Sequence, residues 1–307
     1  MAKVLIATEK PFAPAAVQSI REIVENAGFE LALLEKYTDK AQLFEAVKDA
    51  DALIVRSDKI TAEVVEQTQN LKIVVRAGAG YDNLDLEALT AKGVVAMNTP
   101  GQNSNAVAEL ALGMMVSIAR NNYAGTSGSE LKGKSLGIHA YGYVGKGVAT
   151  IAKGFGMKVY AYDPFIDKSI MINDGVEVVD SVEELYSKCR YISLHIPANE
   201  HTKESINYNL LMSMPKGATL VNTARKEVIH EDDMLRVLSE REDFRYASDI
   251  APDNKEIIAN KFEGRFFFTP KKMGAQTSEA NINAGIAAAN QIVAFIKEGD
   301  RTFQVNK

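Results

Sequence analysis

A short apolar run, a glycine turn and a second apolar run that ends on an acid constrain this chain more than any other feature. Residues 136–145 read LGIHAYGYVG, a helical pattern follows over residues 146–155, and residues 158–163 read KVYAYD. Strand, tight glycine turn, helix, strand and terminal acid follow one another in this order in βαβ units that bind a dinucleotide. The segment therefore predicts a phosphate-binding turn at the start of a helix.

Single positions in this segment have predicted roles. Gly142 lets the backbone approach a pyrophosphate, and Gly145 lets the helix pack closely against the strand. Free N–H groups at the helix N-terminus then face the phosphates. Asp163 is placed to accept hydrogen bonds from both ribose hydroxyls, and because a carboxylate repels a 2′-phosphate, NAD is favoured over NADP. Ala140 stands where a glycine is usual, and a glycine-rich turn with a capping aspartate is the alternative interpretation.

Strand-like and helix-like patterns alternate along the whole chain. Apolar runs typical of strands lie at residues 4–7, 31–34, 52–55, 73–75, 94–97, 159–162, 191–194, 219–221, 246–247 and 266–268. Helical patterns lie at residues 15–26, 40–47, 62–68, 84–91, 182–188 and 232–241. Strands that alternate with helices indicate parallel sheets covered on both faces. We therefore predict an α/β fold with two doubly wound parallel sheets in two domains.

Two long apolar helical patterns mark the predicted domain boundary. They cover residues 103–119 and 278–297, and both are too apolar to be solvated connectors. We expect the first to lead into the dinucleotide domain and the second to return to the N-terminal domain. The prediction is a discontinuous substrate-binding domain over residues 1–99 and 283–307, a dinucleotide-binding domain over residues 100–282, and a cleft between them for a small substrate.

Composition limits the class of protein. The 307 residues carry a net charge of −5 at pH 7, which argues against nucleic acid or an anionic membrane as the partner. The apolar run over residues 106–119 contains Glu109 and is too short to span a membrane. Cys189 is the only cysteine, so a buried core position is expected for it rather than a disulfide or a zinc cluster. We expect a soluble, cytoplasmic protein without a metal.

Further motifs occur in the order of a known enzyme family. They are RAGAGYDNLD at residues 76–85, NTPGQN at 98–103 with VAEL at 107–110, SLHIP at 193–197 and NTAR at 222–225. With the glycine turn they span nearly the whole chain, which resembles the D-isomer-specific 2-hydroxyacid dehydrogenases. The resemblance implies a flavodoxin-like substrate domain and a Rossmann NAD-binding domain. It is strongest to short phosphoglycerate-oxidising members without a C-terminal regulatory domain, so we expect no serine feedback through such a domain.

The resemblance also implies which residues form the site. Arg225 matches the catalytic arginine of the family, whose planar fork can hold carboxylate and carbonyl oxygens together. The implied cofactor-binding residues are Ala79, Gly142, Tyr143, Val144, Gly145, Asp163, His195, Ile196, Thr223, Ala224, Asp249, Gly274 and Ala275. The implied substrate-binding residues are Arg56, Ser57, Arg76, Gly78, Ala79, Gly80 and Asn103.

The acid/base position departs from the family pattern. The family carries a histidine before an apolar residue, Gly and Ala, and a glutamate that pairs with it, whereas residues 269–275 read TPKKMGA. Counting back from the glycine places Lys272 at the histidine position, and Lys271 is the rival because the run is longer. Asn254 stands where the glutamate is expected, and Asp253 is a doubtful substitute. Lys272 is the predicted acid/base; the alternative is a solvated lysine pair beside the site.

The implied activity is NAD-dependent oxidation of D-3-phosphoglycerate to 3-phosphohydroxypyruvate, the opening step of serine synthesis. A phosphorylated substrate requires extra positive charge, for which Arg56 and Arg76 are candidates, although either could instead pair with an acid. The alternatives are a reductase for hydroxypyruvate or glyoxylate and, in a different class, an NAD-sensing corepressor-like binding protein. We expect a homodimer through the NAD-binding domain, around the first crossing helix and the loop over residues 121–129.

Overall fold

The computed structural model describes residues 1–306 and divides the chain into two compact units. Unit 1 comprises Met1–Asn103 and Thr277–Lys307, and unit 2 comprises Ser104–Gln276. The predicted divisions after residues 99 and 282 lie a few residues from these points, because the whole of the last helix belongs to unit 1.

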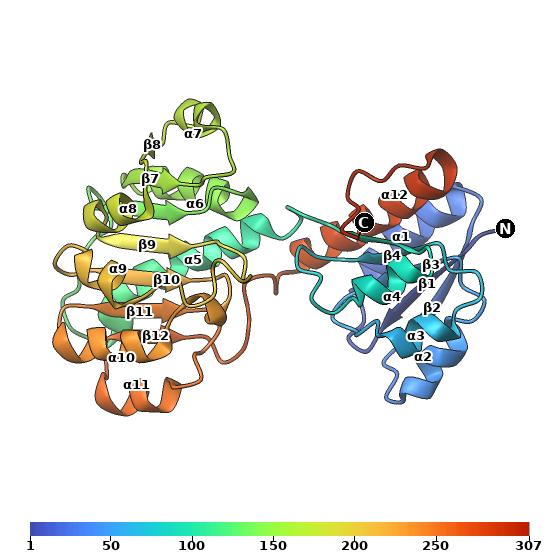
Figure 1. The fold of residues 1–307 in the computed structure, drawn as a ribbon, viewed down its shortest axis with the longest axis horizontal. Helices are drawn as coiled ribbons and strands as arrows, with labels where there is room; N and C mark the ends of the chain where they lie inside the picture. Colours follow the sequence, from blue (N-terminus) through green and yellow to red (C-terminus); the bar gives the residue numbers. More distant parts are fainter. Residues whose placement is uncertain (307) are drawn as a thin grey trace. The chain divides into compact units, whose positions relative to one another are not determined.

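Unit 1 is a parallel five-stranded sheet with helices on both faces (Figure 1). Its strands are β1 Lys3–Thr8, β2 Glu30–Glu35, β3 Ala52–Val55, β4 Ile73–Arg76 and β5 Val95–Asn98. Its helices are α1 Pro14–Asn26, α2 Lys40–Ala46, α3 Ala62–Gln67, α4 Leu86–Ala91 and α12 Ser278–Glu298. The spatial order β2-β1-β3-β4-β5 is the flavodoxin-like order.

Successive residues of each strand in unit 1 enter two different cores. Val4 and Ile6 pack with α1 and α12, whereas Leu5 and Ala7 pack with α2, α3 and α4. Strands buried on both faces need continuous apolar runs instead of an alternating pattern. This is the pattern by which the sequence predicted them.

Unit 2 is a parallel seven-stranded sheet (Figure 1). Its strands are β6 Ser135–His139, β7 Lys158–Tyr162, β8 Glu177–Val178, β9 Tyr191–Leu194, β10 Thr219–Asn222, β11 Arg245–Ser248 and β12 Phe266–Phe268. Its helices are α5 Ser104–Ala119, α6 Tyr143–Gly154, α7 Lys168–Asn173, α8 Val182–Lys188, α9 Tyr208–Ser213, α10 Glu231–Glu240 and α11 Lys255–Lys261. The order β12-β11-β10-β9-β6-β7-β8 is the Rossmann order with one further strand at an edge.

The sheet of unit 2 is covered on both faces. Helices α5, α6 and α7 form one core with it, and α8 to α11 form the other. Cys189 is buried and unpaired in the second core, as predicted. Over residues 1–306, the helices are too short or too polar to cross a membrane, and no group of three or more His, Cys, Asp or Glu could hold a metal ion.

We did not predict α7, β8, α9 or α11. Strand β8 has only two residues, too few to show a period. Helices α7 and α9 are capped at their N-termini by Asp167 and Asn207, whose side chains accept hydrogen bonds from backbone N–H groups. Such short helices depend on caps and tertiary packing rather than on an apolar stripe. The helix predicted over residues 84–91 begins only at Leu86, because Asp85 caps it.

The glycine turn packs α6 tightly against β6. The helix begins at Tyr143, earlier than the predicted residue 146 and directly after Gly142. A Cβ on Gly145 would lie 2.4 Å from the carbonyl oxygen of Ala140, so the close packing predicted for Gly145 is confirmed. Ala140 itself has a φ of 79°. This left-handed conformation costs an L-residue about 1–2 kcal/mol, a cost that the usual glycine avoids.

We expect Gly145→Ala to destabilise the protein by about 2–3 kcal/mol, because the new methyl group meets a backbone oxygen inside the turn. Gly113→Ala is the matched control. Gly113 is an exposed position within α5, and a Cβ there has no atom within 4 Å, so this change should stabilise by about 1 kcal/mol. Urea unfolding measures both variants, and equal free energies of unfolding for the two would contradict the packing argument.

Candidate functional site

The carboxyl ends of six strands in unit 2 share one register row. The row runs Tyr162, His139, Leu194, Asn222, Ser248 and Phe268 across β7, β6, β9, β10, β11 and β12. The residues that directly follow it along this edge are Asp163, Ala140, His195, Thr223, Asp249 and Thr269. Ligands of doubly wound sheets bind at this edge, where the strand order reverses, here between β6 and β9. The structure therefore gathers most predicted cofactor-binding residues of unit 2 along one edge.

The turn at Gly142 fits an anionic group. Helix α6 begins without a side-chain cap, and a Cβ on Gly142 would have no atom within 4 Å. The N–H groups of a first helical turn have no intrahelical acceptor, so this open start suits a phosphate. Asp163 accepts from the N–H of Tyr141 at 2.7 Å and of Phe165 at 2.9 Å. Each carboxylate oxygen keeps a further lone pair for a ribose hydroxyl, so these residues fit NAD.

Two imidazoles beside the turn are uncharged at neutral pH. Burial lowers the pKa of His139 from 6.5 to about 4, although Asp163 opposes the shift. Burial also lowers the pKa of His195 to about 3, and His139 adds to the lowering. His195 Nδ1 lies 3.4 Å from the hydroxyl of Thr223. Its buried Nε2 has no hydrogen-bond partner in the part of the chain that the structure describes.

Arg225 and Lys272 meet at one main-chain oxygen. At the end of β10 the Asn222 side chain accepts from the Ala224 N–H at 2.9 Å and donates to the Arg225 carbonyl at 2.8 Å, which fixes the turn. Arg225 Nη1 donates to the carbonyl oxygen of Ala224 at 3.0 Å. Lys272 Nζ lies 3.5 Å from the same oxygen. Lys271 and Lys272 are both exposed, but the contact with this oxygen favours Lys272 over its rival.

Asp249 holds the segment that carries Lys272. Its side chain is fully buried directly after β11. Its carboxylate accepts from the N–H of Met273 at 2.6 Å and of Gly274 at 2.8 Å. A Cβ on Gly274 would lie 2.9 Å from this carboxylate, so glycine suits the position. Contact of Asp249 with the cofactor stays a prediction, since the observed partners of its oxygens belong to the loop.

The two residues considered in place of the missing glutamate have other partners. Asp253 lies 2.5 Å from the Nζ atom of Lys226. The Asn254 N–H donates to the Glu231 carboxylate at 3.1 Å, and Asn254 Nδ2 donates to the Glu231 carbonyl at 3.2 Å. Asp253 is therefore engaged in an ion pair, and Asn254 ties the loop after β11 to α10.

Arg56 in unit 1 is a half-buried cation held by neutral oxygens. Its Nη1 donates to the carbonyls of Lys10 at 3.0 Å and Pro11 at 3.1 Å, and its Nη2 donates to Asn281. Its guanidinium lies 5.2 Å from the centroid of the Phe12 ring. No ion pair with an acid forms at Arg56 within residues 1–306. A cation oriented in this way suits an anionic substrate group.

Arg76 lies directly over Gly78. A Cβ on Gly78 would be 1.5 Å from Arg76 Nη1, so a larger residue would displace the guanidinium. Arg76 Nε donates to the carbonyl oxygen of Arg56 at 2.9 Å, which ties the two arginines together. Asn98 Nδ2 donates to the Ala79 carbonyl at 2.6 Å and fixes the loop that follows.

The remaining predicted residues differ in exposure. Tyr143 and Ser57 are exposed, and Ile196 and Thr223 are buried. The half-buried ones are Gly80, Asn103, Val144 and Ala275.

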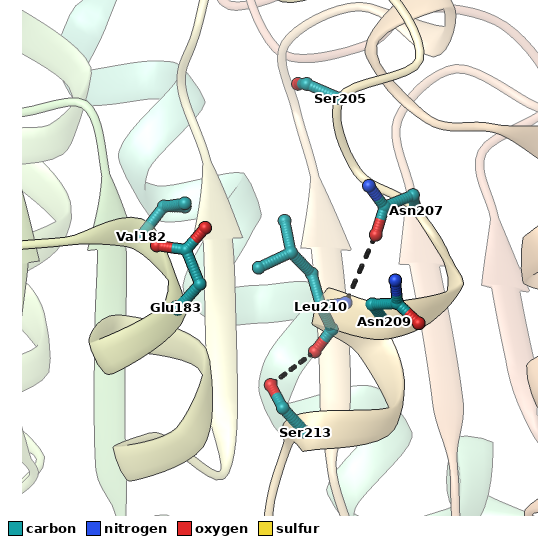
Figure 2. Close-up of a pocket in the computed structure, with 7 residues that line it drawn as sticks. All are labelled: Val182, Glu183, Ser205, Asn207, Asn209, Leu210 and Ser213. Atoms are coloured by element: carbon teal, nitrogen blue, oxygen red, sulfur yellow. Dashed lines mark hydrogen bonds between the residues drawn. The ribbon is translucent and has the colours of Figure 1, made fainter.

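A cavity of about 400 Å³ lies between α8 and α9 (Figure 2). Its lining residues are Val182, Glu183, Ser205, Asn207, Asn209, Leu210 and Ser213. Figure 2 shows Asn207 bonded to the N–H of Leu210, which it caps at 3.2 Å, and Ser213 bonded to the Leu210 carbonyl at 2.7 Å. These polar groups serve the ends of α9, and the lining includes none of the predicted site residues.

Several groups that accept hydrogen bonds from the predicted cations could not be predicted from the sequence. Lys10 and Pro11 contribute only carbonyl oxygens, which every residue has. Asn281 belongs to α12, far along the chain from Arg56. Asn222 had a usable signal, because asparagine at the start of a turn commonly bonds to the backbone two residues on.

The model of the NAD binding domain of the D-isomer specific 2-hydroxyacid dehydrogenases matches residues 102–265. D-3-phosphoglycerate dehydrogenase of Methanocaldococcus jannaschii is 37% identical over 84% of this chain and 52% of its own length. Hydroxypyruvate reductase of Thermotoga maritima is 34% identical over 86% of this chain and 90% of its own length. The chain thus spans about half the length of the first relative.

The crystal structure of NAD⁺-bound 3-phosphoglycerate dehydrogenase from Entamoeba histolytica is 51% identical to this chain. It matches 100% of this chain and 99% of its own chain with a TM-score of 0.90. The predicted α/β fold with two parallel sheets is confirmed. The chain belongs to the family of D-isomer specific 2-hydroxyacid dehydrogenases.

Proposed function

We propose that this protein oxidises D-3-phosphoglycerate to 3-phosphohydroxypyruvate with NAD as its cofactor. The observation that carries the proposal is the meeting of Arg225 and Lys272 at the Ala224 carbonyl, on the sheet edge that fits the nucleotide. Similarity to the NAD⁺-bound phosphoglycerate dehydrogenase, at 51% identity, supports the choice of substrate and cofactor.

In this proposal Arg225 binds and orients the substrate, and Lys272 transfers the proton. Bound NAD supplies the nicotinamide that accepts a hydride. Arg225 presents a planar pair of donors that holds the substrate carboxylate and the oxygen under oxidation. Lys272 in its amine form takes the hydroxyl proton, and in the reverse direction its ammonium returns it.

Unit 1 supplies the groups for the phosphate end of the substrate. Carbonyl and amide oxygens orient Arg56, while burial lowers the pKa of its guanidinium and the charge of Asp58 opposes that shift. Arg76 is tied to it through the Arg56 carbonyl. The backbone of residues 78–80, fixed by Asn98, is our candidate for binding the substrate carboxylate.

Assembly and location are part of the same proposal. We propose a homodimer through unit 2, around α5 and the loop over residues 121–129, in which Tyr123 is 68% exposed. We also propose a cytoplasmic location, where the buried thiol of Cys189 stays reduced. Sedimentation at micromolar concentration tests the dimer.

We expect Lys272→Ala to lower kcat about 10²–10⁴-fold, the usual contribution of an acid/base. The NAD dissociation constant should stay unchanged. Lys271→Ala is the matched control and should keep near-normal turnover, since Lys272 is the lysine whose Nζ lies beside the Ala224 carbonyl. A primary amine in solution should partly restore Lys272→Ala. Near-normal turnover by Lys272→Ala would remove Lys272 from the mechanism.

We expect Arg56→Gln to raise KM for D-3-phosphoglycerate about 10–100-fold, as befits the loss of a charged hydrogen bond worth about 1.5–3 kcal/mol. Turnover of unphosphorylated D-glycerate should change little. Lys59→Gln, an exposed cation in the same loop, is the control. Equal losses on both substrates would argue against phosphate binding by Arg56. Preference of the wild type for hydroxypyruvate reduction would instead favour the activity named for the Thermotoga relative.

The pH dependence of kcat should show no step from the protonation of a histidine. Burial holds the pKa of His139 at about 4 and of His195 at about 3, so both rings are neutral at pH 5.5 and above and gain a proton only below it. We therefore expect kcat between pH 5.5 and 7.5 to lack the step near pH 6.5 that an ordinary histidine base produces. Such a step, measured by NADH absorbance, would point to a histidine acid/base.

A further inference from the structure

A second cavity of unit 2 lies at the edge of the sheet opposite the proposed nucleotide site. It has a volume of about 240 Å³ and is bordered by Tyr191, Thr219 and Arg245, which stand at the amino ends of β9, β10 and β11. The carboxyl ends of the same strands carry His195, Thr223 and Asp249. The full length of the strands therefore separates this cavity from the predicted nucleotide contacts.

One wall of the cavity is the loop that follows α5. A Cβ on Gly128 would lie 2.3 Å from the carbonyl oxygen of Ala119, and the Ser129 N–H donates to that oxygen at 2.7 Å. At the start of the loop, residues 121–123 have φ values of 52°, 53° and 58°. Three successive non-glycine residues in this region cost about 1–3 kcal/mol each. The loop is therefore held in a strained shape against the helix end.

Two arginines line this cavity, and both are oriented by neutral oxygens. Arg190 Nε donates to the Gly217 carbonyl at 2.9 Å, and Arg245 Nη1 donates to the Ile118 carbonyl. Both side chains are half-buried. Within residues 1–306, no carboxylate comes within the 4.0 Å of an ion pair with either of them. Their charges are thus fixed in place without being neutralised.

The two acids that line this cavity form no ion pair with Arg190 or Arg245 within residues 1–306. Asp243 is bonded to Arg241 at 2.6 Å and to the N–H of Gly217 at 2.6 Å, and these bonds, Arg241 foremost, lower the pKa of Asp243. Glu242 is exposed. Ser127, Ser129 and Asn121 are further polar residues of the lining.

We propose that this cavity binds a small polyanion of the phosphate or carboxylate class between Arg190 and Arg245. A volume of about 240 Å³ corresponds to roughly eight water molecules in the liquid, which leaves room for a phosphate group with its waters. Guanidinium groups bind such oxygens with paired, charged hydrogen bonds. The proposal uses none of the residues assigned to the cofactor or the substrate, although the loop over residues 121–129 that lines the cavity also belongs to the proposed dimer contact.

Calorimetric titration with pyrophosphate at low ionic strength tests this proposal. The protein carries Arg56→Gln as a common background and is saturated with NAD, so that neither the proposed substrate site nor the glycine turn at Gly142 contributes heat. We expect Arg190→Gln and Arg245→Gln each to weaken binding about 10-fold, the loss of about 1.4 kcal/mol. Glu242→Gln should tighten binding about 2–5-fold, because it removes a repelling charge from an exposed position that folding does not need. Arg236→Gln, on the exposed side of α10 where Arg236 pairs with Glu240, should leave it unchanged.

The opposite signs expected for the arginine and glutamate variants separate specific binding from a loss of folding. Circular dichroism and the melting temperature identify a misfolded arginine variant, and Glu242→Gln then carries the test alone. Absence of heat with the background protein at millimolar pyrophosphate would overturn the proposal. So would weaker binding by Glu242→Gln. A shift of Arg190→Gln from dimer to monomer, without pyrophosphate binding by the background protein, would assign the cavity to subunit contact instead.

Discussion

Parallel pairing in one register row is the constraint on which the candidate site of unit 2 depends. His139 pairs with both Tyr162 and Leu194, and the row continues through Asn222 and Ser248. A slip of one residue would turn the faces of a strand around and expose one of its two cores. Burial on both faces therefore fixes the row. The row in turn places the glycine turn, the acid after β7 and the turn with Arg225 along one edge.

Elements with long apolar runs were predictable, and short ones were not. Strand β3 begins and ends as predicted at Ala52–Val55, and α8 does so at Val182–Lys188. The two residues of β8 carry no period, and α9 depends on the cap by Asn207. The motifs singled out Arg225 and Lys272 by residue type. Their contact with the Ala224 carbonyl was not predictable, because every residue has a main-chain oxygen and the residue type does not show which one accepts a hydrogen bond.

The backbone after β11 explains how an additional residue before Met273 can be accommodated. Asp249 fixes the N–H groups of Met273 and Gly274. Thr269, which directly follows β12, is fixed by the hydrogen bond of its hydroxyl to Asp249 at 3.0 Å. The segment is thus anchored at both ends. An extra residue changes only the path of the backbone between these two anchored positions. The number of residues that separates a side chain from Gly274 therefore decides where that side chain lies. This anchoring favours Lys272, the residue next to the second anchor, over Lys271.

Cations oriented by carbonyl oxygens recur in this chain. Arg56 is held by two carbonyls, and Arg190 and Arg245 have one each. A carboxylate would orient a guanidinium equally well, but it would also cancel the charge that a substrate anion needs. A carbonyl supplies only a dipole, so it fixes the direction of the donors and leaves the net charge in place. Orientation without neutralisation is what an anion-binding site requires, and here the main chain provides it.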